Sequence, residues 1–157
     1  MTVRSLVFAL CLIAVAAPIP AAEVAGTDAV AIRAVISDQL DAFTRDDAQR
    51  AFSFATPSIR AQFGNAEQFM AMVRASYPVV YRRKSFEFGK PEIVDGEFIQ
   101  PVKMTDGDGR AWLALYPMQR QTDGNWRING CQVARAAGIE ARVPHIRRAG
   151  LKTAGLL

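Results

Sequence analysis

The sequence predicts an α+β fold in which N-terminal helices pack on a curved, four-stranded antiparallel meander sheet. Two patterns along the chain carry this prediction. From residue 28 to about residue 77, apolar residues recur every three or four positions, as on the buried side of a helix. After Arg83 the period changes to two, and tight-turn residues separate the apolar runs. Turns this short cannot join parallel strands, so the strands must be antiparallel.

The first predicted helix begins at Thr27 or Asp28, either of which can cap it. One apolar stripe runs along it, formed by Val30, Ile32, Val35, Ile36, Leu40 and Phe43. A second, short helix is expected to begin at Asp46-Asp47, since carboxylates suit the positive end of the helix dipole.

Two further helices are predicted from their end signals. Thr56-Pro57 is typical of a cap followed by proline at the first helical position, and this third helix ends at Gly64. Asn65 is expected to cap the fourth helix, which ends before Pro78.

Three turn sequences separate the four predicted strands: Asp95-Gly96, Asp106-Gly107-Asp108-Gly109 and Asp123-Gly124. The third strand is apolar on both faces, which predicts a central position in the sheet. Pro101 and Pro117 lack a backbone N–H, so they are expected at bulges, bends or edges. With the first helix closing one face, such a sheet forms a cone that encloses a pocket.

The chain divides into three predicted segments. Residues 1–22 have the order of a signal peptide: Arg4, a short apolar run from Leu6 to Ala17, then Pro18, Pro20 and small residues. The run is too short to span a bilayer, so we expect cleavage near Ala22, no stable membrane span, and a periplasmic or secreted protein. Residues 23–134 form a single domain, and residues 135–157 form a basic tail that we expect to be disordered.

The net charge of +4 lies at the ends of the chain. Residues 23–134 carry 13 Lys or Arg and 14 Asp or Glu, whereas residues 135–157 carry five basic residues and one Glu. The domain is therefore near neutral. Together with the export signal, this excludes a dedicated nucleic-acid-binding protein.

A set of residues spread over about 29–133 carries a family resemblance. They are Phe43, Asp46-Asp47, Ala51-Phe52-Ser53-Phe54-Ala55, Thr56-Pro57-Ser58-Ile59, Phe63-Gly64, Phe69, Met72-Val73, Tyr77-Pro78-Val79-Val80-Tyr81, Gln100-Pro101-Val102 and Asp123-Gly124-Asn125-Trp126-Arg127-Ile128-Asn129-Gly130-Cys131. The chain resembles an exported bacterial family known as domain of unknown function 4864. Its order of elements also resembles the nuclear transport factor 2-like superfamily, which includes ketosteroid isomerase and SnoaL-like polyketide cyclases. The resemblance implies a cone-shaped fold and no particular reaction, because fold alone does not determine function.

Carboxylates are the first candidates for chemistry, because isomerases of the resembled superfamily use them. Asp41, Asp46 or Asp47 could act as a general base, but a working base needs a carboxylate held in an apolar pocket. The alternative is that Asp46 and Asp47 stabilise a helix start and that Asp41 is solvated. The aspartates of the strand region all lie in turns, which argues against ketosteroid isomerase activity.

Nucleophilic and metal chemistry have less support. After cleavage the chain keeps one cysteine, Cys131, and its only histidine, His145, lies in the tail. No Cys-His or Ser-His-Asp set can be built from the domain, and no cluster of metal ligands is present. We therefore expect no catalytic residues, no metal and no cofactor.

Amphipathic aromatic and amide residues are the candidates for a ligand site. We expect a bound small molecule to contact Tyr77, Tyr81, Gln100, Trp112, Tyr116 and Asn129. The favoured function is a non-catalytic module that binds a small molecule or a protein partner. The alternative is a small isomerase- or cyclase-type enzyme using a pocket carboxylate or tyrosine. A homodimer through the open sheet face is a further prediction.

Overall fold

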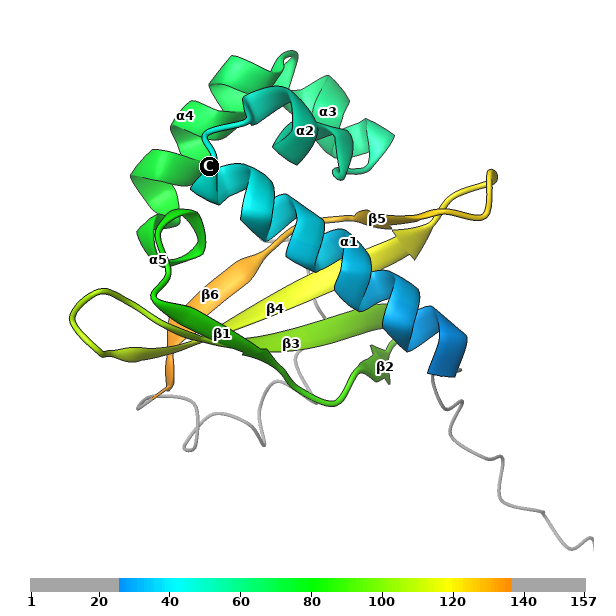
Figure 1. The fold of residues 1–157 in the computed structure, drawn as a ribbon. Coiled ribbons are helices and arrows are strands. Elements are labelled where there is room, and N and C mark those ends of the chain that lie inside the picture. Colours follow the sequence, from blue (N-terminus) through cyan, green and yellow to red (C-terminus); the bar gives the residue numbers. More distant parts are fainter. Residues whose placement is uncertain (1–25, 137–157) are drawn as a thin grey trace, which may run out of the picture.

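The computed structural model describes residues 26–136, and it has helices followed by a curled antiparallel sheet, as predicted (Figure 1). The helices are α1 (Gly26–Thr44), α2 (Ala48–Ser53), α3 (Pro57–Phe63), α4 (Ala66–Ser76) and α5 (Pro78–Tyr81). The strands are β1 (Ser85–Phe88), β2 (Glu92–Val94), β3 (Glu97–Thr105), β4 (Ala111–Arg120), β5 (Trp126–Ile128) and β6 (Gln132–Arg135). The predicted signal peptide, His145 and residues 137–157 of the predicted tail lie outside the described residues.

Helix α1 lies across one face of the sheet (Figure 1). Its predicted stripe is buried at Ile32, Ile36, Leu40 and Phe43, whose spacing of three or four places them on one side of the helix. Val30, at the edge of the stripe, is 69% exposed. The stripe therefore sets which side of α1 meets the sheet.

Local capping residues begin and end the next helices where the sequence predicts. The Asp47 carboxylate accepts a hydrogen bond from a main-chain N–H in the first turn of α2. Thr56 and Asn65 cap α3 and α4 in the same way, and Gly64 ends α3 with φ +74°. Pro78, expected only to stop α4, also begins the short helix α5, since proline fits the first turn of a helix.

Strand β4 is central, as predicted, and pairs with β3 on one side and with β5 and β6 on the other. The first and last predicted strands are each interrupted, which gives six strands in place of four. The breaks lie opposite the two prolines: Gly89 N–H donates to Pro101 O at 2.9 Å, and Asn129 N–H donates to Pro117 O at 2.8 Å. A Cβ on Gly89 would lie 3.1 Å from the Pro101 side chain, so the crowded first break favours glycine.

The sheet has two faces of different character. The inner face, toward α1, is buried and is formed on β3 and β4 by Gln100, Val102, Met104, Ala114, Tyr116 and Met118. The alternate positions form the outer face, on which the described residues place no helix (Figure 1). No helix between residues 26 and 136 is long and apolar enough to cross a membrane.

Candidate functional site

A small void lies between the helical layer and the inner face of the sheet, with a volume of about 50 Å³. It is lined by Gln39, Phe43, Ala55, Ile59, Phe63, Phe69, Met72, Val73, Tyr77, Val80, Tyr116, Ile128, Gly130 and Cys131. The volume suits a few waters or a very small molecule, and is far below that of a drug-sized ligand pocket. Side chains therefore fill most of the cone.

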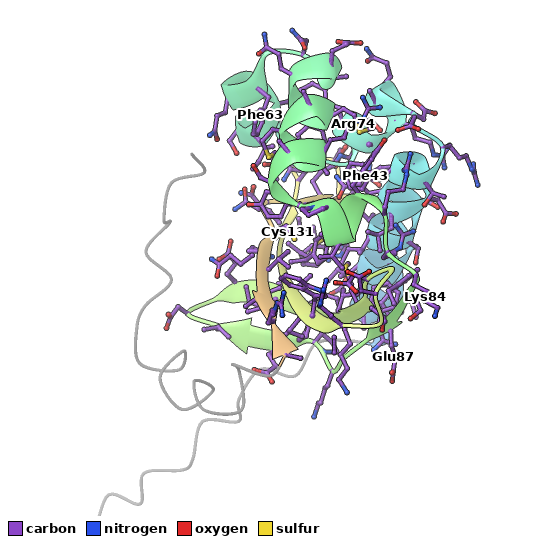
Figure 2. All side chains as sticks on the ribbon, turned by 90° about the vertical axis from the view of Figure 1, so that its left-hand side faces the viewer. Phe43, Phe63, Arg74, Lys84, Glu87 and Cys131 are labelled. Atoms are coloured by element: carbon purple, nitrogen blue, oxygen red, sulfur yellow. The ribbon has the colours of Figure 1, made fainter. Side chains whose placement is uncertain are left out.

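Phenylalanines build the helical wall of the void. The Phe69 ring of α4 contacts the rings of Phe43, Phe52 and Phe63, with centroids 6.1, 5.4 and 5.5 Å away. Figure 2 shows Phe43 and Phe63 in the helical layer above Cys131, which directly precedes β6. Four helices thus meet at one aromatic cluster.

Tyr116 supplies the strand wall and is 1% exposed. Its hydroxyl lies close to the Cys131 thiol, a weak hydrogen-bonding group, and has no partner with good hydrogen-bond geometry among the described residues. Burial, together with the neighbouring Cys131 thiol, raises the pKa of Tyr116 well above its ordinary value. The group is therefore a neutral hydrogen-bond donor at the wall of an apolar void.

Cys131 and Tyr77 flank the same void. Burial raises the pKa of the Cys131 thiol to about 12, so the thiol is protonated at neutral pH and is a poor nucleophile. Burial also raises the pKa of Tyr77, with a smaller contribution from Cys131. None of these groups carries a charge near pH 7.

Among residues 26–136 no carboxylate lines the void, and the three candidate bases lie elsewhere. Asp47 caps α2. Asp41 is exposed and pairs with Arg45 at 3.6 Å and with Arg83 at 3.9 Å. The expectation that Asp41 is solvated and Asp47 stabilises a helix start agrees with these positions.

Asp46 belongs to a surface cluster, which we call the Asp46 corner, with Arg74, Tyr81 and Arg82. The Tyr81 hydroxyl donates to Asp46, and the guanidinium groups of Arg74 and Arg82 lie 2.9 and 2.7 Å from its carboxylate oxygens. These hydrogen bonds, the one from Tyr81 above all, lower the pKa of Asp46 to about 2. Asp46 is thus a structural anion that ties the α1–α2 connection to α4 and α5.

The structure places only Tyr77 and Tyr116, of the six predicted ligand residues, on the void. Tyr81 lies in the Asp46 corner. Gln100 is buried on β3 and donates to Gly89 O at 2.9 Å and Pro101 O at 2.8 Å, which bridges the first strand break.

The two remaining predicted residues have polar partners on the protein. Trp112 Nε1 donates to Asp106 at 2.9 Å and so closes the β3–β4 turn. Asn129 Oδ1 accepts a hydrogen bond from the Thr56 hydroxyl at 3.1 Å, and Asn129 Nδ2 donates to Glu97 at 3.2 Å. Asn129 also lines an open groove beside the β2–β3 turn. Their ligand-binding role stays a prediction.

Sequence reasoning missed the helical lining of the void. Gln39, Phe63 and Met72 lie on three separate helices, and only the packing of α1, α3 and α4 brings them together. The run of phenylalanines from residue 43 to residue 69 is the one signal that could have indicated a shared cluster. Within residues 26–136, no three His, Cys, Asp or Glu side chains are grouped closely enough to hold a metal ion.

Comparison with known proteins gives a family and remote structural neighbours. The model of the family described as domain of unknown function 4864 matches residues 25–141. Aln2 from a Streptomyces species is similar at 14% identity with a TM-score of 0.48, covering 78% of this chain and 99% of Aln2. A Catenulispora acidiphila structure is similar at 13% identity with a TM-score of 0.45, covering 72% and 94%. No curated protein matches.

Proposed function

The chain belongs to the domain of unknown function 4864 family, and we propose that it is a non-catalytic module that binds a small, largely apolar molecule in the void between the helices and the sheet. We propose further that the fold belongs to the nuclear transport factor 2-like superfamily, which the order of helices and meander supports. Export to the periplasm or beyond remains a prediction from residues 1–22, which lie outside the described residues.

The observation that carries this function is the unpartnered hydroxyl of Tyr116. A buried hydroxyl without a hydrogen bond costs about 1–3 kcal/mol relative to a satisfied one. Phenylalanine would fill the same space on β4 without that cost, so the hydroxyl needs a reason outside the packing of the core. A ligand carrying a hydrogen-bond acceptor supplies that reason.

The lining residues also indicate the character of the ligand. Apart from Tyr116, Tyr77, Gln39 and Cys131, the side chains around the void are apolar. A charged ligand would lose its hydration there without gaining a partner of opposite charge. A neutral molecule with one carbonyl or ether oxygen fits the wall.

The void must enlarge to admit more than a few atoms, and its helical wall has side chains suited to this. Met72 of α4 and Phe63 of α3 are only partly buried. Methionine is flexible and adapts to different neighbours. Small rotations of these two side chains would widen the void without moving β4.

A non-catalytic role fits the protonation states of the lining groups. Removing a proton from a substrate requires a base, and none of the described residues that line the void is a carboxylate or a histidine. Tyr116 and Cys131 both hold their protons more tightly than usual, since burial raises the pKa of each. The isomerase- or cyclase-type alternative therefore has no base at this position among residues 26–136.

Paired probes test the proposal. Cyclopentanone and cyclopentane have nearly the same size, and only the ketone has an acceptor, so a hydrogen bond from Tyr116 should strengthen binding of cyclopentanone alone. NMR titration measures both affinities. Tyr116→Phe should weaken cyclopentanone binding and leave cyclopentane binding unchanged, and Tyr81→Phe serves as the control. An unchanged ratio of the two affinities in Tyr116→Phe would refute the role of Tyr116.

A further inference from the structure

The outer face of the sheet carries an apolar row. By register, Ile99 lies opposite Pro117 and Pro101 opposite Leu115, while Leu113 continues the row along β4. We call these five residues the outer row. Ile99 is only 6% exposed, although it is not part of the hydrophobic cluster between α1 and the inner face. Ile99 and Pro117 are buried, and Pro101, Leu113 and Leu115 are partly buried, so the row offers apolar surface that a further segment can cover.

An acidic hairpin borders one end of the outer row. The β2–β3 hairpin, residues 92–97, carries Glu92, Asp95 and Glu97. None of the three forms an ion pair with another residue of the described part of the chain. Along the rest of this face the charges are balanced, with Glu87 opposite Lys103 on β1 and β3 and Arg127 3.8 Å from Asp123. A basic segment would therefore be attracted to the hairpin end.

The chain leaves the described region beside the other end of this row. Strand β6 pairs with β4, with Ala134 opposite Leu113, and runs antiparallel to it. A segment following Ala136 therefore has to turn back and run along β4 to reach the hairpin. From Leu113 to Pro117 this is about 13 Å, which four extended residues cover.

Residues 137–157 have the composition that such a covering segment needs. Their basic residues are Arg142, Arg147, Arg148 and Lys152, against the single acidic residue Glu140. Their large apolar residues are Ile139, Val143, Ile146, Leu151, Leu156 and Leu157. The apolar residues suit the outer row, and the basic residues suit the acidic hairpin.

In place of the disorder that composition alone predicts for the tail, we propose that residues 137–157 fold back along β4 and cover the outer row, with their basic side chains against the β2–β3 hairpin. The outer face is then an intramolecular docking surface, independent of the void on the inner face. A second copy of the chain is the competing occupant. It is less favoured, because two identical faces would bring two acidic hairpins into one interface.

Thiol accessibility at Leu115 tests this proposal in the full mature chain, residues 23–157. In a Cys131→Ala background, Leu115→Cys should react with a maleimide at least tenfold more slowly than Ser53→Cys, which is on the exposed surface of α2. Adding Arg147→Glu and Arg148→Glu should remove most of this protection. Adding Glu92→Lys to that variant should restore part of it, because opposite charges then face each other again.

Controls separate the proposal from its alternatives. Arg45→Glu with Arg60→Glu changes the net charge equally on the helical layer and should leave the reaction rate unchanged. Circular dichroism confirms that each variant is folded. Reaction at the Ser53→Cys rate, or protection that the Arg147 and Arg148 changes do not affect, would overturn the proposal. Protection that grows with protein concentration, with a dimer in sedimentation velocity, would overturn it too and assign the face to a second copy.

Discussion

Tyr81 and Tyr116 are the same residue type in opposite circumstances. Tyr81 lies in the Asp46 corner, where its hydroxyl donates to Asp46 and accepts from Arg74 at 3.0 Å and Arg82 at 2.9 Å. The Arg82 guanidinium also lies over its ring, 3.8 Å from the centroid. Tyr116 is enclosed mainly by apolar side chains with the Cys131 thiol beside it, and its hydroxyl has no partner with good hydrogen-bond geometry among the described residues.

The contrast shows which hydroxyl forms its hydrogen bonds within the protein and which can form one with a ligand. Every hydrogen-bonding position of the Tyr81 hydroxyl is used within the protein, so a ligand would have to break existing bonds to reach it. The Tyr116 hydroxyl gains a bond from any acceptor that enters the void. A tyrosine offers binding capacity only when the fold leaves it without a partner.

The largest difference between the two residues should appear when the ring is removed. Tyr116→Ala deletes a fully buried ring and should lower the free energy of unfolding by about 3–5 kcal/mol. Tyr81→Ala removes a ring that is only partly buried and should cost less than half as much. Urea unfolding followed by circular dichroism measures both values, and equal losses would contradict the contrast.

Removing only the hydroxyls should give a smaller effect of opposite sign. Tyr116→Phe removes an unsatisfied buried group and should leave the free energy of unfolding unchanged or raise it by up to about 1 kcal/mol. Tyr81→Phe removes a hydroxyl with three polar partners and should lower it by up to about 1 kcal/mol. A loss of stability in Tyr116→Phe would show that the hydroxyl is satisfied in solution.

The smallest expected effect is a shift in the acid sensitivity of folding. The pKa of Asp46 is lowered from 3.8 to about 2 in the folded protein. Because the folded form binds this proton less readily than the unfolded form, Asp46 stabilises the protein above about pH 4 and loses that contribution as pH falls toward 2. Asp46→Asn should therefore flatten the pH dependence of unfolding between about pH 4 and 2.

The hydrogen bond from Tyr81 is the main cause of this shift, which gives a direct check. In Tyr81→Phe, NMR titration of Asp46 should show its pKa closer to 3.8. Tyr116→Phe should leave that pKa unchanged, since Tyr116 is not among the groups that shift it. An unchanged Asp46 pKa in Tyr81→Phe would assign the shift to the arginines alone.

Sequence patterns predicted the features that depend on neighbouring residues. The caps at Asp47, Thr56 and Asn65 and the stop at Gly64 were all predicted, because each involves contacts within one turn of helix. The central position of β4 followed from its apolar residues on both faces. These features need no knowledge of how distant segments pack.

Features that depend on distant segments could not be predicted in the same way. The breaks at Gly89 and Asn129 arise opposite prolines on neighbouring strands, a relation that only the register reveals. Tyr81 and Tyr116 look alike as amphipathic aromatics, and their environments differ through the placement of Asp46 and Cys131. The helical wall of the void needs three helices to meet, so its residues gave no joint signal.

The interrupted outer strands also protect the sheet against pairing with other chains. The strands β1, β2, β5 and β6 that border β3 and β4 are three or four residues long, so no edge among the described strands offers a long ladder of free N–H and C=O groups. The segment before α3 also uses backbone groups of β5. Thr56 N–H donates to Ile128 O, and Ile128 N–H donates to Phe54 O, both at 2.9 Å. Misassembly into fibrils would first require these short strands to detach.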